Sequence, residues 1–396
     1  MIDALSTAQQ DALAGFRDFV DRHVVPHAER YHYAQATPRE AITQLAKMGY
    51  LGLSLPPSVG GGGCDHVTLG LLHQEFGRGC ASLRSLLTVH GMVAHSIKRW
   101  GHSRQKAQWL QRLASGESLA AFALSEPLVG SDAKAIVTEA TETASGYVLR
   151  GEKKWITYGQ VADLYLVFAR CQGQPTAFLV ERTTPGLQTQ PIQDLLGLRA
   201  SMTARLVFED CLIPKENLLG RVGLGVSLVA ASALELGRLT VAWGCVGLAQ
   251  ACSDASLIYT SERTQFGSLL REQPLIQQLI SNLLTNLSAA RLLCLQASRL
   301  CDQQDPGAAM AIAMAKYFAS KAAVQAALDA VQIHGANGCS REVAVQRHLG
   351  DAKIMEIIEG SSQIQEISIA KYGYQERLSQ LARQRAVAGG TQESST

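Results

Sequence analysis

The sequence lacks several features that mark particular classes of protein. Its 396 residues carry a net charge of only +2 and no dense run of Lys or Arg, so we do not expect a nucleic-acid-binding surface. The first residues lack the basic segment and long apolar core of a signal peptide. No apolar run reaches the roughly 18 residues of a membrane span. These absences favour a cytoplasmic protein that does not cross a membrane.

Cysteine is present, but not in the patterns of a metal site. The nine cysteines are scattered, and no two of them have Cys-x-x-Cys spacing. Most of them lie in apolar stretches of the sequence. The odd number and the scattered positions predict reduced, mostly buried thiols and argue against a zinc site.

Proline is scarce in the last part of the chain, where only two prolines follow Val226. Residues 308–330 contain eleven alanines, a composition that favours helices in close contact. We therefore predict an antiparallel bundle of four helices over residues 223–378. The polar residues 379–396 are expected to form a disordered tail.

The rest of the chain divides by its hydrophobic pattern. Over residues 1–119, apolar side chains recur at helical spacing, which predicts an N-terminal helical domain. Over residues 120–222, short β-rich runs punctuated by Pro and Gly predict a small antiparallel barrel. The four glycines from Gly60 to Gly63 are not followed by Lys-Ser/Thr and are interpreted as a loop, not a phosphate site. The predicted fold class is mainly α with one β domain.

A candidate catalytic group is the carboxylate of Glu359, which directly precedes Gly360 and two serines. A carboxylate at a backbone break can point into a cleft, and small neighbours let a substrate approach the main chain. Alone, a Glu before a Gly more often marks only the end of a helix. Four motifs upstream change that interpretation. They span residues 122–132, 154–157, 206–214 and 263–267.

The order and spacing of these five motifs resemble the acyl-CoA dehydrogenase family over almost the whole chain. The resemblance implies three domains, a bound FAD and oxidation of an acyl thioester between its α- and β-carbons. That reaction needs a base, a hydride acceptor and donors to the enolate oxygen. By the resemblance, Glu359 is the base, with a pKa raised by an apolar cleft, and the flavin N5 accepts the hydride. Some relatives place the base instead before an Arg, a position occupied here by Gly237, before Arg238.

The resemblance also implies which residues hold the FAD. Phe122, Leu124 and Ser125 would line the isoalloxazine ring, Trp155 would cover its other side, and Thr157 would reach toward N5. Alternatively, Trp155 is an ordinary core residue. Other contacts would meet the phosphates and the adenosine, some of them in the FAD of a neighbouring subunit. These are Arg263 and Phe266, which would cross to the neighbour, and Gln332, Gly335, Ser361 and Gln363.

Four positions are expected to meet the substrate, namely Ser131, Arg238, Gly360 and Arg84. Arg84 falls where the glutaryl-CoA branch of the family has an Arg for a distal carboxylate, although it could instead be a surface helix residue. The same segment resembles members from polyketide and nonribosomal peptide gene clusters, which act on acyl carrier protein thioesters. We therefore expect a short, polar acyl thioester of coenzyme A or of a carrier protein.

Two other functions remain as alternatives. The first is a flavin-dependent oxidase or monooxygenase of the same fold, against which Glu359 argues. The second is a helical scaffold that has lost the flavin, against which Ser125, Trp155 and Thr157 argue. The resemblance further implies a homotetramer or homodimer, and an electron acceptor that is either an electron-transfer flavoprotein or oxygen.

Overall fold

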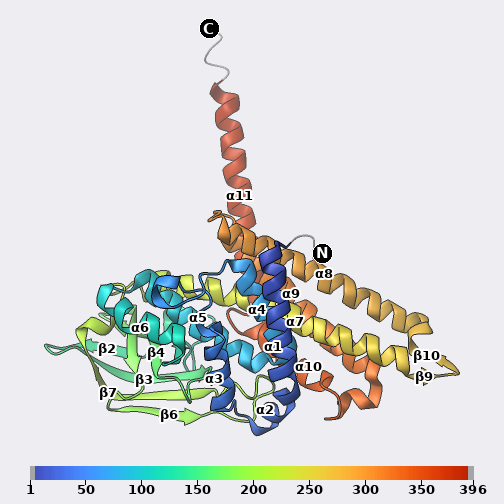
Figure 1. Cartoon of the computed structure of the whole chain (residues 1–396). Helices are drawn as coiled ribbons and strands as arrows, with labels where there is room; N and C mark the ends of the chain where they lie inside the picture. The colour runs from blue at the N-terminus through green and yellow to red at the C-terminus, as the bar shows by residue number, and fades with distance from the viewer. Residues whose placement is uncertain (1–4, 391–396) are drawn as a thin grey trace.

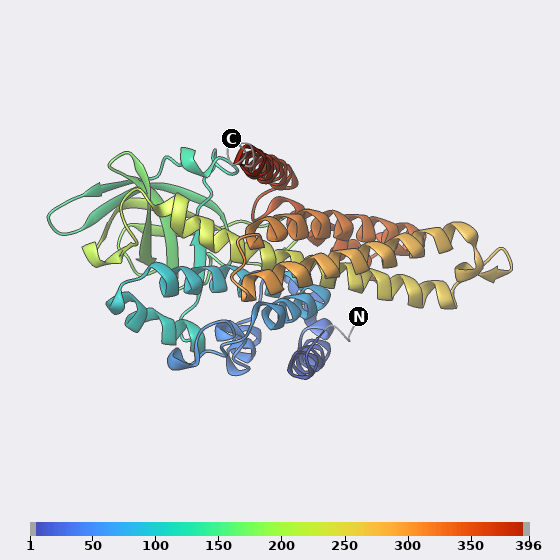
Figure 2. The same cartoon turned by 90° about the horizontal axis from the view of Figure 1, so that it is seen from above.

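The computed structural model describes residues 5–390 of the chain. A sheet and short helices form one end of the molecule, and long helices run from there to the opposite end (Figure 1). Seen from above, the N-terminal helices lie along one side of the long helices (Figure 2). The order along the chain is helices, then strands, then long helices, so the predicted three-part architecture is confirmed.

Polar side chains fix where the N-terminal helices begin. The hydroxyl of Ser6 accepts a hydrogen bond from the Gln9 N–H, and the Gln9 side chain accepts one from the Ser6 N–H. Asp65 likewise accepts from the Thr68 N–H. Only the extended Cys80 separates the fourth helix from the fifth. The helices are α1 Thr7–His23, α2 Ala28–Ala34, α3 Arg39–Lys47, α4 His66–Gly79, α5 Ala81–Trp100 and α6 Ser103–Ser115.

The middle region is a mixed sheet with the strand order β6-β7-β3-β2-β4-β5-β8 and with β1 beside β4. Most pairs are antiparallel, but β1 and β2 each pair with β4 in parallel. The predicted β domain is therefore present, but its sheet is mixed where an antiparallel barrel was expected, because β4 returns beside β1 only after the chain has crossed through β2 and β3. The strands are β1 Ala120–Ala123, β2 Glu139–Glu142, β3 Tyr147–Ile156, β4 Leu164–Cys171, β5 Gln174–Glu181, β6 Leu187–Pro191, β7 Ala204–Ile213 and β8 Leu218–Leu219.

The C-terminal region is helical. Three long helices pack against one another, α10 packs on α7 and α9, and α11 contacts α9. A short hairpin of two strands joins α7 to α8 at the far end of the molecule (Figure 1). The elements are α7 Ala231–Glu262, β9 Thr264–Gln265, β10 Ser268–Leu269, α8 Pro274–Asp302, α9 Ala308–His334, α10 Val345–Ile357 and α11 Ser362–Gly390.

The C-terminal tail differs from its prediction. Residues 379–390 continue α11 as a helix, whereas their polarity predicted disorder. Ala, Gln and Arg make up seven of these twelve residues, and all three are good helix formers, so polarity alone was a poor guide. Residues 391–396 lie outside the described residues.

One segment, Gly225–Glu262, is long and apolar enough by composition to cross a membrane. It consists of a π-helical turn followed by α7. More than half of its most apolar stretch is buried inside the structure, and α7 packs against α4, α8 and α9. A helix covered on several sides needs an apolar composition to form a protein core. The apolar character of this segment is therefore explained by its place in the bundle.

Glycines let α4 approach α7 closely. A Cβ atom on Gly77 would lie 2.2 Å from the carbonyl oxygen of Gly244, and one on Gly247 would lie 1.8 Å from that of Gln74. Neither distance is possible for non-bonded atoms, so a side chain at either position would push the helices apart. This contact fixes the position of the N-terminal domain on the bundle.

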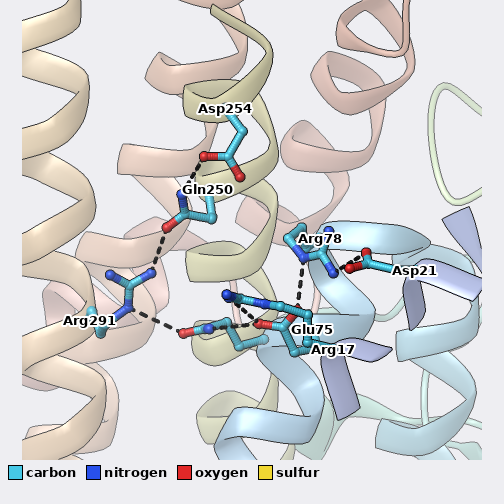
Figure 3. A network of polar contacts seen from close by, with 8 residues as sticks. Arg17, Asp21, Glu75, Arg78, Gln250, Asp254 and Arg291 are labelled. Carbon is cyan, nitrogen blue, oxygen red and sulfur yellow. Dashed lines mark hydrogen bonds and ion pairs between the residues drawn. The ribbon is translucent and has the colours of Figure 1, made fainter. Parts of the chain in front are cut away.

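A buried carboxylate ties α1 to α4. The side chain of Glu75 is fully buried, and it contacts Arg17 from α1 at 3.1 Å and Arg78 from its own helix at 2.8 Å. Arg78 also donates to Asp21 of α1 at 2.6 Å (Figure 3). A buried carboxylate that lost these cations would be strongly destabilising, so the cluster holds α1 in place.

The same cluster extends to the long helices. Gln74 donates to Glu75 at 3.2 Å and accepts a hydrogen bond from Arg291 of α8 at 3.3 Å. Arg291 also donates to Gln250 of α7 at 2.9 Å, and Gln250 donates to Asp254 at 2.7 Å (Figure 3). One continuous set of polar contacts therefore joins four helices from two regions of the chain.

We expect Gly247→Ala to destabilise the protein. The added methyl group would overlap the main chain of α4, and overpacking of this kind costs about 1–3 kcal/mol. Urea unfolding followed by circular dichroism measures the effect. The matched control is Gly15→Ala in α1, where a Cβ meets no atom within 4 Å and should stabilise the helix by up to ~1 kcal/mol. Equal effects of the two substitutions would contradict the close contact.

Candidate active site

Glu359 lies on a tight turn between α10 and α11. Its φ angle is +55°, and that of Gly360 is +93°, so the backbone is left-handed at both residues. Glycine adopts this conformation freely, but a glutamate does so at an energetic cost. Such strained residues concentrate at functional sites. The backbone break that the sequence indicated is therefore present at Glu359.

The carboxyl group of Glu359 packs against α7. A Cβ atom on Gly237 would lie 2.9 Å from Glu359 Oε2 and 2.8 Å from the sulfur of Met92. Position 237, where some relatives carry their base, and the Glu359 carboxyl group therefore share one region of the molecule. The absence of a side chain at Gly237 leaves the space that Glu359 fills.

The surroundings of Glu359 change its affinity for protons. Burial raises the pKa of the Glu359 carboxyl group above its usual value of 4.5, because the charged form loses hydration. The nearby cations of Arg238, Arg84 and Lys316 oppose this rise without cancelling it. A carboxylate with a raised pKa is a better general base, and the direction agrees with the sequence-based expectation.

Arg84 lies on α5 with its side chain buried close to Glu359. Its exposure is 0%, so the interpretation as a surface residue is wrong. Its Nη1 donates to Thr88 at 2.9 Å, and the Thr88 hydroxyl lies 3.1 Å from that of Thr240 on α7. Its Nε and Nη2 have no hydrogen-bond partner among residues 5–390. A buried guanidinium with unused donors favours a polar ligand group beside it.

Strand β1 carries the first predicted flavin segment, and a buried histidine fixes that strand. His90 of α5 donates through Nε2 to the Leu113 carbonyl at 3.0 Å and accepts at Nδ1 from the Ala120 N–H at 3.2 Å. Burial lowers the pKa of His90 to about 4, so the ring is neutral, as this pattern requires. Farther along β1, the ring of Phe122 packs on Phe168 at 5.1 Å.

A buried ion pair fixes the residues that follow β1. The Lys153 ammonium lies 2.7 Å from the Glu126 carboxylate, and both side chains are at most 1% exposed. Lys153 also donates to the Leu124 carbonyl at 3.0 Å, and the Lys154 N–H donates to the Ser125 carbonyl at 2.9 Å. Strand β3 thus holds Leu124 and Ser125 in a defined conformation.

Trp155 lies at an irregularity of β3. The pairing of β3 with β7 shifts register between Lys153 and Ile156, and Trp155 has a φ of +65° there. Its side chain is 51% exposed, with the Lys154 ammonium 4.6 Å from the ring. The alternative of an ordinary core tryptophan is therefore wrong. Thr157, two residues later, is partly exposed.

Sequence profiles of the acyl-CoA dehydrogenase N-terminal, middle and C-terminal domains match residues 6–117, 121–211 and 225–373. A mitochondrial short-chain specific acyl-CoA dehydrogenase of Rattus norvegicus is 38% identical over 360 residues, which cover 89% of this chain and 87% of that protein. The chain belongs to the acyl-CoA dehydrogenase family. It is thus an oxidoreductase that acts on CH–CH bonds.

Solved structures of the family superpose on most of the chain. The butyryl-CoA dehydrogenase of Megasphaera elsdenii has a TM-score of 0.90 at 33% identity and covers 93% of this chain and 98% of its own. A glutaryl-CoA dehydrogenase from Mycobacterium smegmatis in complex with FADH2 has a TM-score of 0.89 at 30% identity, and the match covers 93% of this chain and 95% of that one. The prolyl acyl carrier protein oxidase AnaB has a TM-score of 0.89 at 26% identity, and the match covers 93% of this chain and 99% of that one.

Acyl-CoA dehydrogenases are FAD-dependent, and FAD is the cofactor of this chain. The exposed indole of Trp155 fits this cofactor. Trp155 is 51% exposed, so its ring is free to pack on the planar ring system of a flavin. The middle region would supply the ring contacts through Phe122, Leu124, Ser125, Trp155 and Thr157.

A second group of predicted cofactor residues lies far from the first. Arg263 and Phe266 belong to the β9–β10 hairpin, at the end of the molecule opposite to the sheet (Figure 2). Gln332 and Gly335 end α9 near the same place, where Tyr259 of α7 stacks on His334 at 4.3 Å. The structure therefore places these four residues at the same end of the long helices, away from the residues of the middle region.

The remaining predicted residues have different surroundings. Arg238 donates through Nε to the Glu359 carbonyl at 3.1 Å, so it contacts the turn that carries Glu359. Ser361 and Gln363 follow that turn, partly exposed and exposed, respectively. Ser131 is exposed on the connection between β1 and β2, and no hydrogen bond joins it to the side chains around Glu359 among the described contacts.

Sequence reasoning missed three side chains around Glu359. Met92 borders Gly237 and the carboxyl group of Glu359, while Lys316 and Gln365 donate to carbonyl groups of the turn, including that of Gly360. Lys316 is one of only two lysines within the alanine-rich stretch of residues 308–330, and Lys321 is the other. Nothing in the local sequence distinguished Met92.

A hollow of about 460 Å³ lies elsewhere, between α3 and the connection from β3 to β4. Arg39, Lys47, Asp163 and Met202 are among its lining residues, and none of the predicted site residues borders it. The active site is therefore assigned from the groups around Glu359, because those groups can perform the chemistry of the family.

We expect Gly237→Ala to slow substrate oxidation. The new methyl group would displace the carboxyl group of Glu359, and a shift of about 1 Å at a reacting group can lower the rate roughly 100-fold. Stopped-flow measurement of flavin reduction tests this. The control is Gly91→Ala on α5, where a Cβ meets no atom within 4 Å and the rate should stay unchanged. Wild-type flavin reduction by Gly237→Ala would contradict the placement of Glu359.

Proposed function

We propose that this acyl-CoA dehydrogenase oxidises a short, polar acyl thioester, with Glu359 as the base that removes the α-proton. The observation that carries the proposal is the Glu359 carboxyl group, which is held on a left-handed turn against Gly237 and has a raised pKa. FAD, when bound, accepts the hydride from the β-carbon. The backbone N–H of Glu359 is the donor that we assign to the thioester carbonyl.

The side chain of Arg84 supports a polar acyl group. It is fully buried, is close enough to Glu359 to affect its pKa, and has two nitrogens without a hydrogen-bond partner among the described residues. An unbranched hydrocarbon chain would leave those donors unsatisfied, whereas a distal carboxylate or hydroxyl would accept from them. We therefore favour short dicarboxylic or hydroxylated acyl groups.

The carrier of the acyl group can be coenzyme A or an acyl carrier protein. The short-chain and butyryl-CoA relatives support coenzyme A, and the structural likeness to AnaB supports a carrier protein. We propose coenzyme A as the first carrier to test, because the relatives named for it are more similar in sequence. Oxidation of a carrier-protein-bound precursor of an extender unit is the second candidate.

The electron acceptor distinguishes a dehydrogenase from an oxidase or monooxygenase of the same fold. We propose that electrons pass to an electron-transfer flavoprotein, since the chain retains Glu359 for dehydrogenation. Slow reoxidation of the reduced enzyme by oxygen is the expected result. Fast reoxidation would favour the oxidase alternative. The location that we propose is the cytoplasm.

We also propose that the protein acts as a homodimer or homotetramer. The residues assigned to the flavin ring lie in the middle region, whereas the β9–β10 hairpin, to which Arg263 and Phe266 belong, lies at the opposite end of the molecule (Figure 2). One cofactor cannot contact both groups within a single chain arranged in this way. A second copy that presents its β9–β10 hairpin would complete the site.

Replacement of the base is the central test. Glu359→Gln should retain FAD and fold normally but reduce its flavin about 10²–10⁴-fold more slowly. The wild-type rate should fall as the pH decreases through the raised pKa of Glu359, because the protonated carboxyl group cannot accept the α-proton. Stopped-flow absorbance of the flavin with butyryl-CoA and glutaryl-CoA measures both effects. A wild-type rate in Glu359→Gln would refute the proposed base.

The acyl group is tested by substitution of Arg84. Arg84→Leu should weaken turnover of glutaryl-CoA or hydroxybutyryl-CoA by roughly 10-fold or more, because loss of a charge-assisted hydrogen bond costs about 1.5–3 kcal/mol. Turnover of butyryl-CoA should change little. The ratio of kcat/KM values for the two thioesters measures the selectivity. An unchanged ratio, or a wild-type preference for unbranched acyl groups, would argue against a polar substrate.

A further inference from the structure

Lys316 is a buried cation that the assignments above leave without a role. It lies on α9 among alanines, with 0% exposure. Its ammonium group forms no ion pair within 4 Å among the described residues, although a buried charge normally requires one. Burial accordingly lowers the pKa of Lys316 to about 8. A cation kept under these conditions has to be compensated by other contacts.

Those contacts are carbonyl oxygens on both sides of the catalytic turn. Lys316 Nζ donates to the Gly360 carbonyl at 2.7 Å and to the Glu356 carbonyl at 3.1 Å. The first oxygen belongs to the residue after Glu359, and the second belongs to the last turn of α10. Carbonyls at a helix C-terminus lack intrahelical donors and carry partial negative charge, so they attract a cation. Lys316 therefore bridges α10 and the turn that follows it.

Two further side chains donate to the same turn from other helices. Arg238 of α7 donates to the Glu359 carbonyl at 3.1 Å. Gln365 of α11 donates through Nε2 to the Gly360 carbonyl at 3.2 Å and lies 3.4 Å from the Glu359 carbonyl. The strained turn is thus fixed by donors from α7, α9 and α11. Lys316 makes the shortest of these contacts.

We propose that Lys316 is a positioning residue, which holds the main chain of the Glu359–Gly360 turn and sets the charge beside the base. The inference rests on the assignment of Glu359 as the base. The geometry supports it because both oxygens that Lys316 contacts belong to residues within three positions of Glu359. A strained conformation persists only where its surroundings enforce it.

Lys316 affects Glu359 through its charge, in addition to its hydrogen bonds to the turn. The groups that affect Lys316 are Cys245 and Arg238 on α7, Glu356 on α10, and Glu359 itself. The carboxylate of Glu356 is engaged by Lys353 at 2.6 Å, so Glu359 is the anion with no side-chain ion pair in this set. The cation of Lys316 lowers the pKa of Glu359, and its removal should raise that pKa further.

The experiment compares three variants of the FAD-loaded enzyme. Lys316→Met removes both the donor and the charge, Lys316→Gln retains a donor without the charge, and Gln365→Leu removes a different donor without changing the charge. Lys321→Met, on the exposed side of the same helix, is the control. Flavin reduction by butyryl-CoA and glutaryl-CoA is measured as a function of pH, together with flavin content and the Kd of each thioester.

Lys316→Met should reduce its flavin about 10- to 100-fold more slowly at the pH optimum, a loss typical of a misplaced catalytic group. The acid limb of its pH profile should move to higher pH, while the Kd stays close to wild type. Lys316→Gln should recover most of the rate but keep the shifted acid limb. Gln365→Leu should lose rate without a shift of that limb. Lys321→Met should match the wild type throughout.

Hydrogen–deuterium exchange provides a readout that needs no turnover. Peptides that cover residues 355–365 should exchange faster in Lys316→Met than in wild type, and not in Lys321→Met. Wild-type exchange and an unmoved acid limb in Lys316→Met would overturn the proposal. If Lys316→Met does not fold, the pH profile of Lys316→Gln is the test, and an acid limb at the wild-type position would overturn the proposal. Glu359→Gln distinguishes failure of the proposed base from failure of the proposed role of Lys316. A wild-type rate in Glu359→Gln refutes Glu359 as the base. A slow rate in Glu359→Gln, together with wild-type behaviour of the Lys316 variants, refutes only the positioning role.

Discussion

The close approach of α7 to the N-terminal helices is the constraint on which the rest of the site depends. Three glycines of α7 leave space for different partners, with Gly237 facing Glu359, Gly244 facing Arg84 and Gly247 facing the main chain of α4. The spacing of these glycines places them along one side of the helix. The side chains of Glu359 and Arg84 therefore pack against the same side of α7, where Gly237 and Gly244 leave room for them.

Around Glu359 the balance of charge is positive. Arg84, Arg238 and Lys316 all affect one carboxylate, and burial opposes the charge of each of them. This arrangement is costly in the resting protein, because buried cations lose hydration. Under the mechanism proposed above, it would become favourable when negative charge develops on the thioester oxygen as the α-proton leaves. The three cations would then stabilise an anion that exists only during the reaction.

The sequence was a good guide where chemistry and local pattern coincide. The motifs around Ser125, Trp155 and Glu359 could be recognised because each combines unusual residues with a break in regular structure. The parallel pairs of β4 could not be predicted, because strand pairing depends on how distant segments meet. The helical continuation beyond residue 379 was missed, since polarity was weighed above helix propensity. Lys316 was missed because only the folded chain brings α9 beside the turn of α10.

The two separated groups of cofactor residues have a genetic consequence. Suppose that each FAD is shared between the middle region of one copy and the β9–β10 hairpin of another. Each site then takes its Trp155 from one copy and its Arg263 from the other. A cell that makes one chain with a damaged Trp155 and another with a damaged Arg263 would assemble mixed dimers, and in each of them one site would receive an intact Trp155 and an intact Arg263. Two inactive alleles would therefore complement each other, and at most half of the sites in each mixed dimer would be active.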